Sequence, residues 1–135
     1  MIVLDASAVV ELLAAGPLAP LIRHELAIRD DALIVPHLLD VEVAGALRGL
    51  GLSGNLGKEL AAQALAALAE LPAERIPHTH LLERIWELRR NFTAYDATYI
   101  ALAEWAGAVL ITCDAKMARG HRAPVALIRK GARPR

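Results

Sequence analysis

Short apolar runs alternate along the chain with longer stretches of helical periodicity, and this alternation restricts the fold more than any other feature. Five runs have the length and composition of strands, at about 2–4, 33–35, 75–77, 109–112 and 125–128. Strands separated by helices are typical of a parallel sheet covered by helices. We therefore expect an α/β fold, a three-layer α/β/α sandwich with a central, mostly parallel five-stranded sheet.

Helical patterns fill most of the sequence between these runs. We expect helices over about 7–14, 18–28, 38–50, 53–70, 79–90 and 94–106. Residues that favour the N-cap position open several of them: Ser7, Ser53 or Asn55, Thr79 and Thr93. Glycines at 51 and 107 mark the ends of two of the helices. No linker, repeat or low-complexity segment interrupts the pattern, so residues 1–135 are expected to form a single domain.

Acidic residues follow two of the predicted strands. Asp5 ends the apolar run at 1–4, and Asp114 ends the run at 109–113. A carboxylate at the end of a buried strand is costly to desolvate, so it usually has a partner or a function. In open parallel sheets, ligands bind at the carboxyl ends of the strands, where the strand order reverses. If the two strands are neighbours, Asp5 and Asp114 meet at that edge.

Two further acids, Glu42 and Asp96, lie among apolar residues on predicted helices. Each acid has an ordinary explanation when it is taken alone. Asp5 or Asp114 could form a turn, Asp96 could complement its helix dipole, and Glu42 could extend from the edge of the buried face to water. Together, carboxylates within about 4–6 Å repel one another unless a cation or protons intervene. Oxygen ligands favour Mg²⁺ or Mn²⁺, so we expect the four acids to bind one of these ions.

The sequence does not support a zinc site or the common nucleotide- and phosphate-binding motifs. His78 and His80 have no nearby cysteine that would complete a zinc site. Residues 49–54 match the letters of a dinucleotide-binding fingerprint but follow a predicted helix instead of a strand, so we interpret them as a helix end and loop. No Walker lysine motif occurs, and the first strand lacks the second acid that haloacid dehalogenases and receiver domains carry beside it.

A carboxylate-bound Mg²⁺ or Mn²⁺ typically serves phosphoryl chemistry, in which the metal activates a water molecule and neutralises the leaving oxygen. No serine of the chain has a convincing base beside it as a nucleophile would require. Ser7 and Thr112, each two residues from a strand-end acid, could orient a carboxylate or a metal-bound water. They could equally serve as a helix cap and as a β-branched strand residue.

Basic residues are concentrated at the C-terminus. Of the 15 Lys and Arg residues, seven follow Asp114, with no acid among them: Lys116, Arg119, Arg122, Arg129, Lys130, Arg133 and Arg135. Such a segment attracts phosphates or an acidic partner, although it could also be a solvated charge run. We expect Arg89, Arg90, Lys116, Arg119 and Arg122 to guide a phosphate backbone.

Four segments around the acids, 1–8, 41–47, 95–103 and 110–118, together resemble the PIN domain family, specifically its VapC-type toxins of bacterial toxin–antitoxin pairs. The resemblance implies a Mg²⁺- or Mn²⁺-dependent endoribonuclease whose site is built from Asp5, Glu42, Asp96 and Asp114. It also implies a homodimer that a cognate VapB-like antitoxin neutralises, commonly by sending a basic side chain into the metal site. Family members often carry a further polar or acidic residue shortly after the fourth acid. This chain has Ala115 and Lys116 there, which argues against a second metal held by side chains.

The expected reaction is hydrolysis of RNA phosphodiesters by metal-activated water, leaving a 5′-phosphate and a 3′-hydroxyl. The alternative is a noncatalytic protein- or RNA-binding module that uses the acidic cluster as a structural cation site. An alanine-rich face at 61–69 could serve a subunit or antitoxin interface, or pack in the core.

The expected location is the cytoplasm. The lone cysteine, Cys113, cannot form an internal disulfide and fits a reducing compartment. No apolar stretch approaches the roughly 20 residues that cross a bilayer, so no membrane association is expected. Asp5 and Glu11 interrupt the apolar N-terminus, which also lacks the basic start of a signal peptide.

Overall fold

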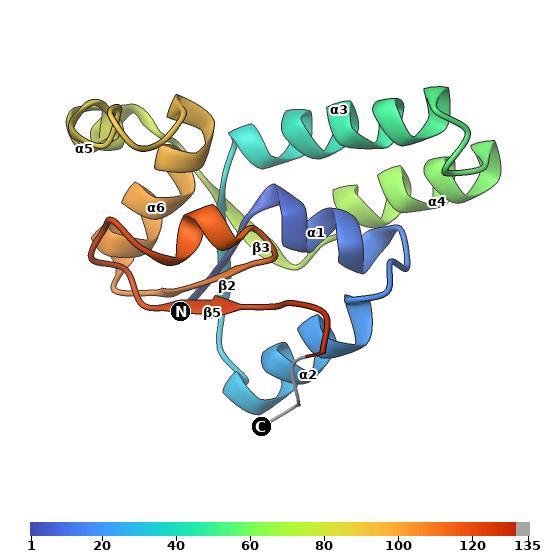
Figure 1. Cartoon of the computed structure of the whole chain (residues 1–135), viewed down its shortest axis with the longest axis horizontal. Coiled ribbons are helices and arrows are strands. Elements are labelled where there is room, and N and C mark those ends of the chain that lie inside the picture. The colour runs from blue at the N-terminus through green and yellow to red at the C-terminus, as the bar shows by residue number, and fades with distance from the viewer. Residues whose placement is uncertain (132–135) are drawn as a thin grey trace.

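The computed structural model describes residues 1–131 of the chain, and a sheet of five parallel strands lies at its centre (Figure 1). The strands are β1 (Ile2–Leu4), β2 (Leu33–Pro36), β3 (Ala73–Ile76), β4 (Val109–Thr112) and β5 (Val125–Leu127). Their order in the sheet is β3-β2-β1-β4-β5. The chain therefore builds one half of the sheet outward from β1 and then returns to build the other half from β4.

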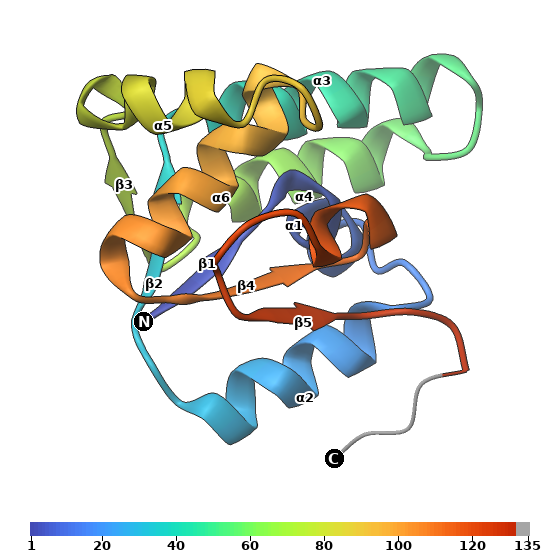
Figure 2. The same ribbon diagram turned by 60° about the vertical axis from the view of Figure 1, so that its left-hand side comes forward.

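Helices cover both faces of this sheet. They are α1 (Ala6–Leu13), α2 (Ala19–Arg29), α3 (Leu38–Leu52), α4 (Lys58–Ala69), α5 (Leu82–Glu87) and α6 (Ala94–Ala106), with 3₁₀ turns η1 (Thr79–Leu81) and η2 (Ala115–Ala118). Parallel crossovers are right-handed, and the chain reverses its direction across the sheet between β3 and β4. Helices α5 and α6, which precede β4, therefore lie on the opposite face of the sheet from α1 and α2, which follow β1. Figure 2 shows α2 and α6 on opposite sides of β4 and β5. The expected α/β/α sandwich is confirmed.

The core includes buried residues of α1 and α3 as well as of α6, and α6 carries the longest buried stretch. All three residues of β1 are buried, and α6 is buried over seven consecutive residues, 97–103. Three alanines in that stretch allow the helix to approach the sheet closely, while Tyr99 and Leu102 fill the remaining space. The first turn of α6, which carries Asp96, is thereby fixed against the strands.

Both predicted ends of α6 are confirmed. The Thr93 hydroxyl accepts a hydrogen bond of 3.1 Å from the Asp96 amide, and Gly107 ends the helix in the left-handed conformation at φ 64°. Such a φ favours glycine because it has no Cβ to clash with the backbone.

Several predicted helix boundaries are wrong. The N-cap of α1 is Asp5, whose side chain accepts a hydrogen bond from the Ala8 amide, and Ser7 lies inside the helix. Ser53 ends α3 instead of opening α4, which begins at Lys58 after an extended Gly57. Helix α3 continues through the glycines at 49 and 51 to Leu52, slightly past its expected end, and the 49–54 segment holds the end of the helix and the start of a loop, as interpreted.

The helix expected over 79–90 is shorter and interrupted. Thr79 makes no capping hydrogen bond but begins the 3₁₀ turn η1, and α5 ends at Glu87. The third strand begins earlier than expected, at Ala73, and ends before Pro77, because proline has no amide to continue the ladder. Within residues 1–131, no helix is long and apolar enough to cross a membrane.

Candidate active site

Asp5 is one of the few polar residues in the core. It follows β1 directly, and its side chain is only 4% exposed. Its carboxylate accepts hydrogen bonds from the Ser7 hydroxyl (2.6 Å), the Ala8 amide (3.1 Å) and the Thr112 hydroxyl. Burial raises the pKa of Asp5 above its ordinary value, these hydrogen bonds oppose the rise, and the charge of Asp96 adds to it. A fully ionised Asp5 thus depends on local hydrogen bonds or a cation.

The ends of β1 and β4 are joined by side-chain hydroxyls. The two strands pair in parallel with Leu4 beside Ile111, so the adjacency expected for them is confirmed. The Ser7 hydroxyl accepts a hydrogen bond of 3.0 Å from the Cys113 amide, and the Thr112 hydroxyl accepts one of 3.0 Å from the Asp114 amide. Both hydroxyls also donate to Asp5. Ser7 and Thr112 therefore connect Asp5 to the segment that carries Asp114.

Glu42 extends from α3 toward this edge of the sheet. Its side chain is partly buried, and its Oε1 accepts a hydrogen bond of 2.6 Å from the Tyr99 hydroxyl. Burial raises the pKa of Glu42, and the negative charges of Asp96 and Asp5 raise it further, against the lowering effect of the Tyr99 bond. Glu42 is thus close enough to both acids for their charges to act on it.

Asp96 lies in the first turn of α6 and is partly buried. Burial raises its pKa, and the charge of Asp114 raises it further, while Lys116 and the Thr93 hydrogen bond lower it. Asp114 accepts a hydrogen bond of 3.0 Å from the Lys116 amide, and its Oδ2 lies 3.9 Å from the Lys116 ammonium. Asp96 therefore interacts electrostatically with the other three acids.

The tertiary structure thus brings together acids from four separate segments of the chain. All four carry oxygen donors only, which is the donor type that Mg²⁺ and Mn²⁺ prefer. Among residues 1–131, however, no three His, Cys, Asp or Glu side chains stand close enough to enclose a metal ion by themselves. Side chains of this set would therefore hold an ion partly through water molecules.

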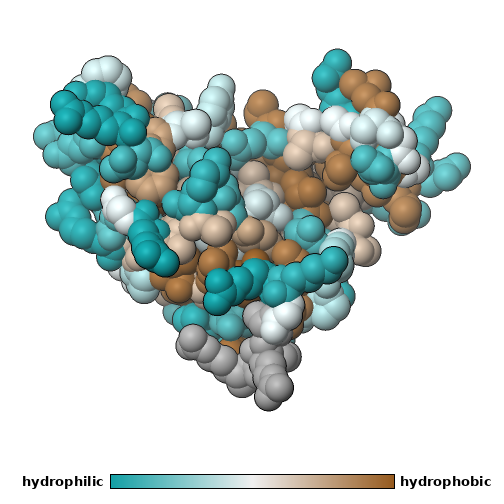
Figure 3. Space-filling model, viewed as in Figure 1, coloured by the Kyte–Doolittle hydropathy of each residue, from teal (hydrophilic) through white to brown (hydrophobic). Residues whose placement is uncertain are grey.

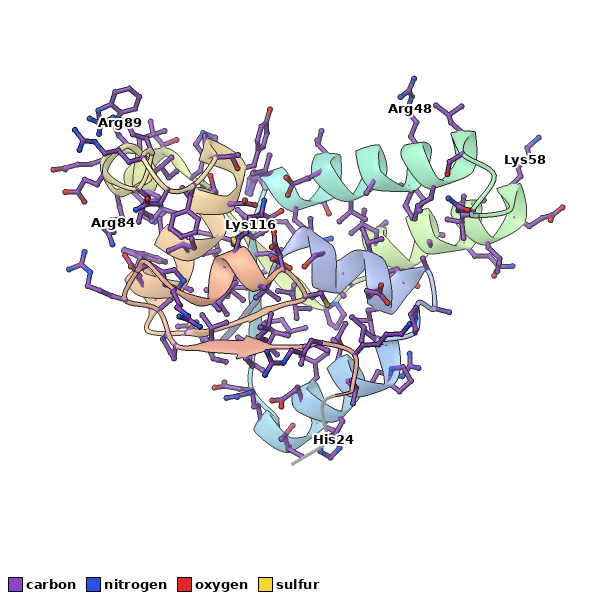
Figure 4. All side chains as sticks on the ribbon, viewed as in Figure 1. His24, Arg48, Lys58, Arg84, Arg89 and Lys116 are labelled. Atoms are coloured by element: carbon purple, nitrogen blue, oxygen red, sulfur yellow. The ribbon has the colours of Figure 1, made fainter. Side chains whose placement is uncertain are left out.

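Lys116 is the cation at this site. In the space-filling view, the upper edge of the molecule is hollowed between the lobe of α5 and α6 and the lobe formed by the far ends of α3 and α4 (Figure 3). In the same view Lys116 lies below this hollow, between α6 and α1 (Figure 4). Its side chain is 78% exposed, so the ammonium is accessible to a ligand that enters the acidic cluster.

The other cations expected to contact RNA lie apart from the acids or on the open surface. The Arg89 guanidinium stacks 4.5 Å from the ring centroid of Trp86, and Arg122 pairs with Glu104 at the opposite end of α6 from Asp96. Arg90 and Arg119 are exposed. Arg133 and Arg135 of the basic C-terminal segment lie outside the described residues.

Sequence reasoning missed Tyr99 as a partner of the site. It is not among the site residues that the sequence predicts, yet its hydroxyl contacts Glu42 directly. Its position three residues after Asp96 places both side chains on one face of α6, which is the signal that could have identified it. His80, by contrast, packs edge-on against Trp105 at a centroid distance of 4.5 Å, remote from the acidic cluster.

Comparisons with known proteins agree with this architecture. A family model described as the PIN domain matches residues 2–122. A VapC ribonuclease of Mycobacterium bovis is 43% identical over 118 residues, which cover 87% of this chain and 88% of the relative. Ribonuclease VapC1 of Mycobacterium tuberculosis is 41% identical over 123 residues, covering 90% and 92%.

A crystal structure of VapBC2 from Rickettsia felis, bound to a DNA fragment from its promoter, has the same fold. It aligns with a TM-score of 0.72 at 16% identity over 95% of this chain and 99% of that chain. The family model covers most of the chain, and the curated relatives match nearly all of it at more than a third identity. The chain belongs to the PIN domain family.

Proposed function

We propose that the protein is a metal-dependent endoribonuclease, the toxin of a toxin–antitoxin pair, which hydrolyses RNA phosphodiesters. The observation that carries this proposal is the convergence of Asp5, Glu42, Asp96 and Asp114, whose charges act on one another at the carboxyl end of β1 and β4. Relatives named as VapC ribonucleases at 41% and 43% identity support it. A scaffold without catalytic function would have no need of four mutually repelling carboxylates.

The donor set fits Mg²⁺ or Mn²⁺ held by a mixture of side chains and water. Mg²⁺ usually keeps several water ligands, so it does not require three side chains in direct contact. We assign Asp5 and Asp96 as direct or water-bridged ligands, and Glu42 and Asp114 as residues that complete the shell and position water. Bound there, the ion would supply an activated water and neutralise charge on the leaving oxygen. With Ala115 and Lys116 after the fourth acid, the chain offers no side-chain ligand there for a second ion.

Other residues of the site prepare these groups. Ser7 and Thr112 each satisfy one Asp5 oxygen and so fix the carboxylate plane. Lys116 is placed to pair with a phosphate oxygen of the substrate, since its ammonium is exposed and 3.9 Å from Asp114. The products of hydrolysis would carry a 5′-phosphate and a 3′-hydroxyl. Arg89, Arg90, Arg119 and Arg122 would contact the RNA backbone farther from the cut.

The proposed partners are a cognate VapB-like antitoxin and a second copy of the chain in a homodimer. The fold likeness to the VapBC2 structure supports the antitoxin, and the homodimer is expected from the family membership. We also propose that residues 1–135 form a single domain. The proposed location is the cytoplasm, where the RNA substrate is found.

Mapping new RNA ends after induced expression tests the function. Wild-type protein should arrest growth and generate discrete 5′-phosphate ends, whereas Asp5→Asn and Asp96→Asn should generate none. Both substitutions remove charge at nearly constant volume, so the variants should remain folded by circular dichroism. Full cleavage by either variant would refute the site assignment. Growth arrest without new ends, unchanged in the variants, would favour a noncatalytic binding module.

A further inference from the structure

Tyr99 is the largest of the fully buried side chains, with 1% of its surface exposed. It has a single polar side-chain atom, the hydroxyl, and this atom donates to Glu42 Oε1 at 2.6 Å. The two residues are 57 positions apart in the sequence and belong to α6 and α3. A buried hydroxyl without a hydrogen-bond partner is unfavourable. Tyr99 therefore favours the conformation of Glu42 in which the carboxylate accepts its hydrogen bond.

Glu42 needs such an anchor to stay in the acidic cluster. A glutamate has three rotatable side-chain bonds and gains freedom when it extends to solvent. The carboxylates of Asp96 and Asp5 repel the negative charge of the Glu42 carboxylate. Both effects would move an untethered carboxylate away from the other acids. The hydrogen bond from Tyr99 opposes both of them.

The contact also decides which oxygen remains available. Tyr99 occupies Oε1, and no hydrogen bond to Oε2 of Glu42 exists within residues 1–131. Because the Tyr99 side chain is buried, its hydroxyl is held beside Glu42. Oε2 of Glu42 is thereby left for other contacts.

We propose that Tyr99 is a positioning residue, which holds Glu42 in the acidic cluster so that its second oxygen can serve a divalent cation or a cation-bound water. This inference rests on the proposed function. It assigns Tyr99 no contact with the substrate or with the ion. Asp96 precedes Tyr99 by one turn on the same helix, so α6 provides both an acid of the site and the anchor for another.

The test compares Tyr99→Phe with Tyr95→Phe in the full chain. Phe removes only the hydroxyl, and Tyr95 is a matched control on the same helix with 58% of its side chain exposed. Mn²⁺ affinity, measured by calorimetry or electron paramagnetic resonance, should fall about tenfold in Tyr99→Phe, the effect of losing one hydrogen bond to a charged group. Tyr95→Phe should bind Mn²⁺ as the wild type does.

A double-mutant cycle separates positioning from a general loss of stability. If Tyr99 acts through Glu42, adding Tyr99→Phe to Glu42→Ala should weaken Mn²⁺ binding no further. If Tyr99 were merely structural, Tyr99→Phe would lower the unfolding temperature but leave Mn²⁺ affinity unchanged. Any losses of affinity in the cycle would then be additive. Either Mn²⁺ result, an unchanged affinity in Tyr99→Phe or additive losses in the cycle, overturns the inference.

Crystal structures of the wild type and Tyr99→Phe decide the question independently of metal binding and activity. The Glu42 carboxylate should leave its position, or become disordered, in Tyr99→Phe alone. If Glu42 stays in place without the hydroxyl, the inference is wrong even if the protein is a nuclease. If the wild type neither binds Mn²⁺ nor cleaves RNA while Glu42 still moves in Tyr99→Phe, the proposed function fails and the anchoring role stands.

Discussion

Thr112, the last residue of β4, donates a hydrogen bond from its hydroxyl to the carboxylate of Asp5, the residue that follows β1. The same hydroxyl accepts a hydrogen bond from the Asp114 amide. One side chain thus connects two of the four acids across neighbouring strands. Because Thr112 has no exposed surface, water cannot replace either bond if the hydroxyl is lost.

Thr112→Val should therefore weaken both folding and the site. Valine keeps the shape but leaves a buried carboxylate and amide each short of a partner, which costs about 1–3 kcal/mol in the free energy of unfolding. Cleavage should fall as Asp5 loses its fixed orientation. Denaturant unfolding and RNA cleavage assays measure the two effects.

Thr98→Val is the matched control. Thr98 is also buried, but its hydroxyl donates only to the Ala94 carbonyl within α6, which keeps its intrahelical bond when the hydroxyl is removed. It should cost less stability and leave cleavage unchanged. Equal loss of activity in both threonine variants would mean that Thr112 acts only through packing.

Neutralising Asp96 should stabilise the metal-free protein at neutral pH. The folded-state pKa of Asp96 is raised, chiefly by burial, so its contribution to stability is largest below the ordinary pKa of 3.8 and is lost as pH rises through the folded pKa. Asparagine does not ionise, so Asp96→Asn does not lose stability in this way as pH rises. In EDTA, the variant should unfold at a higher denaturant concentration than the wild type at pH 7, and the difference should shrink as pH falls toward 3.8.

Divalent cations should make the wild type more stable than Asp96→Asn. An ion that binds only the folded state stabilises it in proportion to its occupancy. Millimolar Mn²⁺ should raise the melting temperature of the wild type by several degrees and that of Asp96→Asn by much less. A variant that gains as much as the wild type would show that Mn²⁺ binds elsewhere.

Lys116→Gln should reduce cleavage and its dependence on salt. An exposed lysine that pairs with a phosphate contributes about one released counterion, so the slope of log affinity against log salt should fall by about 1. Lys58→Gln provides the control, since Lys58 is exposed and lies at the far end of α4 (Figure 4). If both lysine variants change the slope alike, the effect of Lys116 comes from net charge and not from its place beside Asp114.

Glu104→Gln should destabilise the packing around α6. Glu104 accepts hydrogen bonds from Arg84 Nε (2.7 Å), Arg84 Nη2 (3.0 Å) and the Arg122 amide (2.8 Å), and thereby joins α5, α6 and the segment before β5. Burial alone would raise the pKa of Glu104, but the bonds and charges of Arg84 and Arg122 together lower it. Its contribution to stability is therefore present above the ordinary carboxyl pKa and is lost as pH falls through the folded pKa.

At neutral pH, Glu104→Gln should lower the free energy of unfolding by about 1–3 kcal/mol, because charge-assisted hydrogen bonds are replaced by weaker ones. Glu83→Gln, on the exposed side of α5, should change it by less than about 0.5 kcal/mol. Thermal or denaturant unfolding measures both. A Glu104→Gln variant as stable as Glu83→Gln would show that the three bonds contribute little.

Local sequence patterns were sufficient to predict the architecture and the places of the two strand-end acids. Buried strands are short and apolar, and a charged residue directly after one has only the carboxyl edge of the sheet to occupy. The positions of Asp5 and Asp114 thus follow from the strand pattern without any knowledge of side-chain contacts. The ends of α6 were likewise fixed locally, by the Thr93 cap and by Gly107, because each requires only neighbouring backbone groups.

The contacts between polar side chains could not be predicted from local sequence patterns. Asp5 and Ser7 are both residue types that favour a helix N-cap, and Asp5 is the N-cap of α1. The Ser7 hydroxyl instead accepts a hydrogen bond from the Cys113 amide, which follows the neighbouring strand β4. The contact between Tyr99 and Glu42 joins two helices 57 residues apart in the sequence. Periodicity indicates which face of a helix is buried, but the partner of a buried polar atom depends on how two distant segments pack, and that is set by the whole core.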